Sequence, residues 1–213
     1  MRAIVSNLLT KSPDVNCKER LIQFLRKNSF VPGEVTLASG KKSNYYFDCK
    51  LTTLSPEGAV LTARAVLELL DKHNIQAEAI GGPALGAIPI VAAVVAVSEM
   101  QHRRIQGFLI RPERKQHGLH KVVEGLRNTK GTKVVIVDEV CTTGDSTFKA
   151  IQTAREEGLD IVAVISLVDR EEGGSDKLRN EYPYPYYPVC TARELLAVER
   201  EDARESAQAH ARR

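Results

Sequence analysis

Residues 134–147 read VVIVDEVCTTGDST: an apolar run, two adjacent acids, and a turn of small polar residues. The apolar run is rich in valine and isoleucine, which is typical of a strand buried on both faces of a parallel sheet. A helix is predicted directly after the turn, over Ser146–Glu157, with Gly158 at its end. The acids and the turn therefore lie where a strand ends and a helix begins, and ligands of open parallel sheets bind at such an edge.

The turn carries the donors of an anion site. Backbone N–H groups of residues 142–146, the hydroxyls of the two threonines and of Ser146, and the positive end of the next helix favour a phosphate monoester. Gly144 lets the backbone come close to such a ligand. The pattern G-x-x-x-x-G-K-[ST] is absent, which argues against an ordinary nucleotide triphosphatase. Two carboxylates, Asp138 and Glu139, beside a phosphate are costly unless a cation, sugar hydroxyls or a developing positive charge compensates them.

Outward from this stretch the chain alternates strands and helices, which indicates an α/β fold with a central, mainly parallel sheet flanked by helices. Strands are expected at 77–80, 107–110, 133–137 and 161–168, with helices from Ser55 to Leu70 and from about Ile88. A Gly-Gly-Pro loop is expected after the first of these strands.

The two ends of the chain differ from this core. An amphipathic helix running to Asn28 and two short strands at 35–37 and 45–47 predict a small N-terminal subdomain. Thr191 and Glu194 form a capping-box pattern that opens a C-terminal helix. We therefore divide the chain into residues 1–54, 55–190 and 191–213.

Composition sets outer limits on function. The chain has 213 residues, 43% of them hydrophobic and 27% charged, and its net charge of +3 is too small to indicate nucleic-acid binding by itself. Its four cysteines lie far apart without metal-ligand spacing, which favours a reducing compartment. The start lacks an apolar signal region, and the longest apolar stretch, 87–98, is too short to span a bilayer. We expect a cytoplasmic protein without membrane or nucleic-acid partners.

With its strand, two acids and Thr-Thr-Gly turn, this stretch resembles the phosphoribosyl pyrophosphate motif of the type I phosphoribosyltransferases. The resemblance implies that family's fold, with a small N-terminal hood subdomain completed by C-terminal residues. It implies that the acids hold the ribose 2′ and 3′ hydroxyls and that the turn holds the 5′-phosphate. The residues so implied are Asp138, Glu139, Val140, Cys141, Thr142, Thr143, Gly144, Asp145 and Ser146. The alternative is a plain strand-to-helix connection.

Three further segments resemble those of orotate phosphoribosyltransferases. TLASGKKSNYYFD at 36–48 is similar to the hood segment, and RPERKQHG at 111–118 resembles the mobile catalytic loop. LVDREEGG at 167–174 contains the arginine that matches the partner of the orotate carboxylate. The implied orotate contacts are Tyr46, Phe47, Thr142 and Arg170, and the implied pyrophosphate contacts in the loop are Arg111, Lys115 and His117. GGPALGAIP at 81–89 matches the pyrophosphate-side loop.

Each segment has a structural alternative. The basic run could be a solvated surface loop, and the glycine-rich one a tight turn. One of Tyr45 and Tyr46 is expected to pack in the core, because alternate strand residues face opposite ways. Arg170 could form a surface ion pair with Glu171 or Glu172, although a planar guanidinium at the end of a buried strand suits a carboxylate.

The sequence departs from the family pattern in places. Some members have lysine at the positions of Ala38, Gly86 and Pro112, and proline inside a mobile loop fixes φ and removes a donor. Asp145 places a carboxylate in the phosphate nest, so we expect it to point away from phosphate.

The resemblance implies transfer of the phosphoribosyl group to orotate, with release of pyrophosphate, by a homodimer with shared sites. The catalytic residues would be Arg111, Lys115, His117, Asp138 and Glu139, and Mg²⁺ would be held mainly through substrate and water, with no direct protein ligand. Two alternatives remain: a phosphoribosyltransferase for another base, and a regulator that binds phosphoribosyl pyrophosphate without catalysis.

Overall fold

The computed structural model describes residues 17–36, 40, 42–112 and 122–197. The elements, in chain order, are α2 (Cys17–Ser29), β1 (Phe30–Thr36), β2 (Lys42–Phe47), α3 (Lys50–Thr53), α4 (Pro56–Lys72), β3 (Ala79–Pro83), α5 (Ala87–Met100), β4 (Gln106–Ile110), β5 (Val123–Glu124), β6 (Lys133–Cys141), α6 (Asp145–Glu156), β7 (Asp160–Asp169), α7 (Gly174–Glu181) and β8 (Tyr186–Thr191). Among the described residues, no helix has the length and apolar character needed to cross a bilayer.

The central sheet has the strand order β5-β4-β3-β6-β7-β8. All neighbouring pairs are parallel except β4 and β5, so the short β5 is an antiparallel edge strand. The chain passes from β3 to β4 on one side and then returns to β6 on the other side of β3. The order therefore reverses between β3 and β6, and ligands of such sheets bind at this switch point. The predicted α/β class is confirmed.

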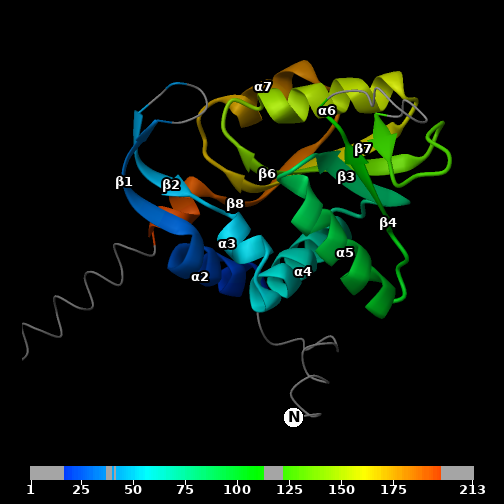
Figure 1. Ribbon diagram of the computed structural model, residues 1–213. Coiled ribbons are helices and arrows are strands. Elements are labelled where there is room, and N and C mark those ends of the chain that lie inside the picture. Colours follow the sequence, from blue (N-terminus) through cyan, green and yellow to red (C-terminus); the bar gives the residue numbers. More distant parts are fainter. Residues whose placement is uncertain (1–16, 37–39, 41, 113–121, 198–213) are drawn as a thin grey trace, which may run out of the picture.

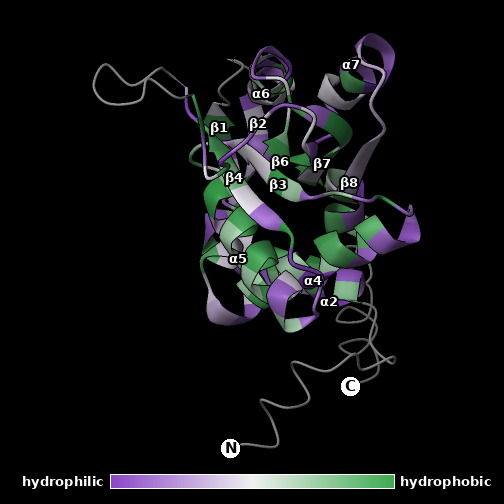
Figure 2. Ribbon diagram, turned by 90° about the vertical axis from the view of Figure 1, so that its right-hand side faces the viewer, coloured by the Kyte–Doolittle hydropathy of each residue, from purple (hydrophilic) through white to green (hydrophobic). Residues whose placement is uncertain are grey.

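Helices cover both faces of this sheet. In Figure 1, α6 and α7 lie above it, and α2, α4 and α5 lie below. The residues of β6 alternate between the two layers: Val135 and Val137 belong to the core on the α4 and α5 side, and Val134 and Ile136 to the core beneath α6. Hydrophilic residues occupy the outer side of α6 and α7 (Figure 2). Burial on both faces explains why this strand is apolar throughout.

A separate antiparallel pair, β1 and β2, stands beside the carboxyl ends of the central strands; we call it the hood sheet (Figure 1). Phe30 and Phe47 are paired across it, and their ring centroids lie 5.6 Å apart. Both strands are longer than expected, because β1 begins directly after α2 and β2 begins at Lys42. The hood sheet packs on α2, and Phe47 shares a core with Leu21 and Leu25 of that helix, so the pair is not an isolated hairpin, which alone is marginally stable.

Two predicted helix starts have the side-chain caps that the sequence indicated. Ser55 Oγ accepts a hydrogen bond from the Gly58 backbone N–H at 3.1 Å, at the start of α4. Thr191 and Glu194 form the reciprocal bonds of a capping box, at 2.8 and 3.2 Å, and helix follows over 192–197. These two helix starts are confirmed, whereas residues 1–16 and 198–213 lie outside the described part of the chain.

Several boundaries were predicted wrongly. The expected Gly-Gly-Pro loop at 81–83 is instead the end of β3. In this strand Gly81 lies so close to β4 that an added Cβ would be 2.3 Å from the backbone of Phe108. Only glycine allows the two strands to pack this closely. Strand β6 continues past Val137 through both acids to Cys141. The sequence reading also missed α3, β5, α7 and β8.

Candidate active site

A cleft of about 400 Å³ opens at the carboxyl ends of β3, β6 and β7 and beside the hood sheet. Its lining residues are Tyr46, Phe47, Pro83, Ala84, Gly86, Asp138, Glu139, Val140, Thr142, Thr143, Gly144, Asp145, Ser146 and Arg170. The structure thus brings together four segments that are spread over more than a hundred residues of sequence, from Tyr46 to Arg170. The cleft lies at the switch point of the sheet, where ligands of this class of fold bind.

The turn after β6 is shaped by two glycines. Gly144 has φ +82°, a left-handed conformation that favours glycine, and it precedes the first residue of α6. Gly174 packs against the same turn, and its backbone N–H donates to the Thr142 carbonyl at 3.0 Å. A Cβ at Gly174 would lie 2.6 Å from backbone atoms of residues 142–144. Gly174 is therefore a structural partner of the turn that the sequence reading did not identify as such, although the Gly-Gly pair is a visible signal.

We expect Gly174→Ala to displace this turn and to lower kcat/KM for phosphoribosyl pyrophosphate, the ligand that the sequence resemblance implies, by about a hundredfold, the scale of a 1 Å misplacement in an active site. Steady-state kinetics with this substrate varied would measure the change. Gly131→Ala is the control: its φ is +71° but its Cβ would meet nothing within 4 Å. That variant is expected to lose roughly 1 kcal/mol of stability and to keep the wild-type kcat/KM.

Asp138 is buried near the end of β6, and its carboxylate accepts three hydrogen bonds. Oδ2 accepts hydrogen bonds from the hydroxyls of Ser146 at 2.6 Å and Thr147 at 2.9 Å, and Oδ1 accepts one from the Glu139 backbone N–H at 2.8 Å. Burial raises the pKa of this carboxyl above its ordinary value, and the three hydrogen bonds act in the opposite direction. Asp138 thus ties the strand to the first turn of α6.

Glu139 differs from its neighbour because its two oxygens have unlike surroundings. Oε2 accepts a hydrogen bond from Lys50 Nζ at 2.7 Å, while Oε1 is buried and has no hydrogen-bond partner among the described residues. Burial raises the pKa of the Glu139 carboxyl, and Lys50 lowers it. An unpartnered buried oxygen is costly, by about 1–3 kcal/mol, unless a ligand donor reaches it. The contact of Lys50 with Glu139 was not predicted from the sequence.

Cys141 faces away from the cleft. Its side chain packs in the core beneath α6, where burial raises its pKa to about 12. The thiol is therefore neutral at physiological pH. Val140 does line the cleft, and its side chain packs against the other core, on the α4 and α5 side.

The two tyrosines of β2 face opposite ways. Tyr45 packs against Phe30 and Phe47, with ring centroids 6.0 and 5.3 Å away, whereas Tyr46 is 41% exposed and lines the cleft. This separation agrees with the expected alternation. Contact of Tyr46 and Phe47 with a base stays a prediction.

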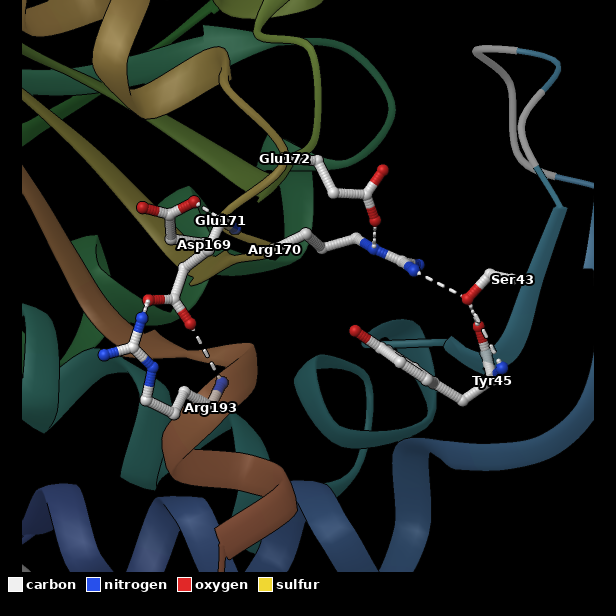
Figure 3. Close-up of polar contacts among 7 residues, drawn as sticks. All are labelled: Ser43, Tyr45, Asp169, Arg170, Glu171, Glu172 and Arg193. Carbon is white, nitrogen blue, oxygen red and sulfur yellow. Dashed lines mark hydrogen bonds and ion pairs between the residues drawn. The ribbon is translucent and has the colours of Figure 1, made fainter.

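Arg170 extends from the end of β7 toward the hood sheet (Figure 3). Its Nε donates to Glu172 Oε1 at 2.8 Å, its Nη2 donates to Ser43 Oγ at 3.0 Å, and its guanidinium lies 4.8 Å from the centroid of the Tyr45 ring. The side chain is only 3% exposed, so this is not a surface ion pair. Arg170 therefore forms the ion pair with Glu172 and also lines the cleft. Its contacts with Ser43 and Tyr45 were not predicted from the sequence.

The loop after β7 is braced by the C-terminal helix. Arg193 Nη2 pairs with Glu171 Oε1 at 2.9 Å, and the Glu171 backbone N–H donates to Asp169 Oδ1 at 2.8 Å (Figure 3). Glu171 has a left-handed φ of +57°. These contacts fix the backbone on either side of Arg170 and so direct its side chain toward the cleft.

The basic loop is only partly within the described residues. Arg111 Nη1 pairs with Glu124 Oε1 at 3.1 Å, and Arg111 does not line the cleft in the described part of the chain. Lys115 and His117 lie outside the described residues. Asp145 is exposed at the start of α6 and lines the cleft. The roles of these four residues stay predictions.

The loop between β3 and α5 also lines the cleft, through Ala84 and Gly86. The peptide between Ala84 and Leu85 is cis. A Cβ at Gly86 would lie 3.0 Å from Glu139 Oε2, so lysine at this position, as in some family members, would disturb the ion pair of Glu139 with Lys50. In the part of the chain that the structure describes, no three His, Cys, Asp or Glu side chains gather as a metal site.

Comparison with known proteins agrees with this geometry. The family model for the phosphoribosyl transferase domain matches residues 55–185, which is more than half of the chain. An orotate phosphoribosyltransferase of Bradyrhizobium diazoefficiens is 43% identical over 162 residues, covering 75% of this chain and 86% of that protein. The chain belongs to the orotate phosphoribosyltransferase family.

Solved structures show the same fold. Orotate phosphoribosyltransferase of Mycobacterium tuberculosis in complex with Fe(III) dicitrate superposes with a TM-score of 0.72 at 30% identity, covering 84% of this chain and 99% of that chain. The same enzyme in complex with phosphoribosyl pyrophosphate superposes with a TM-score of 0.69 at 28% identity, with 84% and 99% covered. These matches confirm the type I phosphoribosyltransferase fold.

Proposed function

We propose that this protein transfers the 5-phosphoribosyl group from phosphoribosyl pyrophosphate to orotate, giving orotidine 5′-monophosphate and pyrophosphate. One observation carries the proposal: the paired acids, the phosphate-binding turn and the buried Arg170 line a single cleft. These groups match the ribose hydroxyls, the 5′-phosphate and the orotate carboxylate. Membership of the orotate phosphoribosyltransferase family supports the same reaction.

Each group has a defined task in this proposal. The backbone N–H groups of residues 142–146 and the hydroxyls of Thr142 and Thr143 hold the 5′-phosphate at the start of α6, while the Ser146 hydroxyl donates to Asp138. Asp138 and Glu139 stabilise the positive charge that develops on the ribose ring as its bond to pyrophosphate stretches. Arg170 binds the orotate carboxylate, so that N1 of the base faces C1 of the ribose. A strong general base is not needed, because the substrate is already an anion.

We further propose that Mg²⁺ takes part, held by oxygens of phosphoribosyl pyrophosphate and by water. The paired carboxylates give the cleft a negative wall, which suits a divalent cation brought in by the substrate. The cation would neutralise the leaving pyrophosphate. Tyr46 and Phe47 would lie near the face of the pyrimidine.

The basic loop is proposed to close over the pyrophosphate of a neighbouring subunit, with Arg111, Lys115 and His117 stabilising the departing anion and excluding water. A homodimer with shared sites follows. Chains carrying Lys115→Ala and chains carrying Asp138→Asn are each expected to lose most of their activity, and mixing them after reversible dissociation should restore activity through heterodimers. Mixtures that stay inactive at every ratio would contradict shared sites.

A cytoplasmic location is proposed from the cysteines. All four lie buried as free thiols. Proteins of oxidising compartments commonly form disulfides.

The test of function is direct. Purified protein is mixed with orotate, phosphoribosyl pyrophosphate and Mg²⁺, and the loss of orotate ultraviolet absorbance is followed; uracil, hypoxanthine and adenine replace orotate in parallel reactions. We expect turnover with orotate alone, abolished by a chelator. Turnover with another base would indicate a different phosphoribosyltransferase, and binding of phosphoribosyl pyrophosphate without turnover would indicate a regulator.

A further inference from the structure

Lys50 reaches Glu139 from a distant part of the chain. It is the first residue of α3, 89 positions before Glu139, and its Nζ lies 2.7 Å from Glu139 Oε2. The Lys50 side chain is 43% exposed and that of Glu139 is 11% exposed, so the contact sits at the border between solvent and the cleft wall. Lys50 itself is not among the described residues that line the cleft.

The backbone around Lys50 is well anchored. The Asp48 backbone N–H donates to the Ser29 carbonyl at 2.9 Å, at the junction of α2 and the hood sheet. Asp48 Oδ1 in turn accepts from the Lys50 backbone N–H at 3.3 Å. Because Phe47, three residues earlier, lines the cleft, Lys50 connects the hood sheet to the acidic pair.

Glu139 is enclosed on its other side by the loop before α5. A Cβ at Gly86 would lie 3.0 Å from both Cβ and Oε2 of Glu139. The carboxylate thus has one oxygen held by Lys50 and one buried oxygen, Oε1, without a partner in the described residues. The terminal torsion of glutamate is soft, and the lysine stem is flexible. A small rotation of the carboxylate can therefore turn Oε1 toward the cleft while Nζ follows Oε2.

We propose that Lys50 is a positioning residue for phosphoribosyl transfer, which holds Glu139 by Oε2 so that Oε1 accepts a ribose hydroxyl of phosphoribosyl pyrophosphate. The inference rests on the proposed function and adds to it a residue outside the cleft lining. A hydroxyl donor on Oε1 would satisfy the oxygen that is otherwise orphaned. The ion pair between Lys50 and Glu139 would then be part of the ribose site rather than a surface contact.

The charges around Glu139 support this role. Burial raises the pKa of Glu139, the carboxylates of Asp138 and Asp48 act in the same direction, and Lys50 opposes them; the buried Cys49 thiol also lies nearby. Lys50 also lowers the pKa of Asp138. Without Lys50 both pKa values rise, so a larger share of each carboxyl is protonated at mildly acidic pH. The acid limb of kcat/KM, which reports the free enzyme, should then move to higher pH.

The test uses Lys50→Met in the full chain. We expect KM for phosphoribosyl pyrophosphate to rise about ten- to a hundredfold, the scale of a lost hydrogen bond to a charged group, with a smaller change in kcat. The acid limb of the pH profile should shift upward, and Lys50→Arg should restore most of both. Lys18→Met is the matched control, because Lys18 makes a 2.7 Å ion pair with Glu194 and is 42% exposed. It is expected to keep wild-type kinetics.

Two results would overturn the proposal. One is a Lys50→Met enzyme with wild-type kcat/KM and acid limb. The other is a uniform loss at every pH that follows a lowered Tm and is not rescued by Lys50→Arg, which would indicate a purely structural ion pair. An inactive wild-type protein would refute the proposed function instead. In that case, calorimetric titration of the wild type and of Lys50→Met with phosphoribosyl pyrophosphate would still show whether Lys50 supports binding.

Discussion

Arg170→Met is expected to lower kcat/KM for orotate by about a thousandfold, while the affinity for phosphoribosyl pyrophosphate stays close to that of the wild type. The guanidinium is buried, lines the cleft and is held by Glu172 and Ser43. Truncating one partner of a buried charge pair costs about 2–5 kcal/mol, and here the group left unpaired would be the orotate carboxylate. Steady-state kinetics with orotate varied, and calorimetry with phosphoribosyl pyrophosphate, would separate the two effects.

Arg170→Lys and Arg179→Met make this prediction specific. Lysine keeps the charge but loses the planar fork, so an intermediate loss is expected. Arg179 also lies over a tyrosine ring, 5.1 Å from the Tyr186 centroid, but outside the lining of the cleft in the described residues. Its methionine variant should use orotate as well as the wild type does. If Arg170→Met also keeps wild-type kcat/KM for orotate, the arginine serves only its ion pair with Glu172.

The centre of the fold could be predicted because its signals are local. The apolar run, the two acids and the glycine turn at residues 134–147 specify a buried strand, a ligand edge and a helix start from adjacent residues. The capping box at Thr191 is equally local. By contrast, α7 is short and polar, and β8 contains a proline, so neither carries a clear period. Their positions depend on packing against β7 and Gly144.

The unpredicted parts of the site are long-range contacts. Lys50 meets Glu139, and Ser43 meets Arg170 across 127 positions, only after the hood sheet has packed beside the central sheet. No spacing in the sequence encodes those pairs. The sequence offered an ion pair or a ligand role for Arg170 as alternatives. In the structure the same side chain is paired and also lines the cleft, which shows that such alternatives need not exclude each other.

Asp138→Asn is expected to lower kcat by about a hundred- to a thousandfold, the scale of removing one preorganised electrostatic group. The negative charge that would stabilise the ribose ring is lost, but the side-chain shape is kept. An amide nitrogen in place of Oδ2 can donate to the hydroxyls of Ser146 and Thr147, which rotate and accept. The loss should therefore lie in kcat more than in the structure of the turn.

Stability should not fall with activity in this variant. Because burial raises the pKa of Asp138, the folded chain binds this proton more tightly than the unfolded chain. Ionisation of Asp138 therefore lowers the free energy of unfolding as the pH rises from the unfolded to the folded pKa. Asparagine does not ionise and so avoids this loss of stability. At neutral pH the Tm of the Asp138→Asn protein should therefore equal or exceed that of the wild type. Asp71→Asn, at a side chain that is 61% exposed, is the control and should change neither kcat nor Tm. An Asp138→Asn protein that loses activity only in proportion to a lowered Tm would show that the carboxylate stabilises the turn and does not act on the substrate.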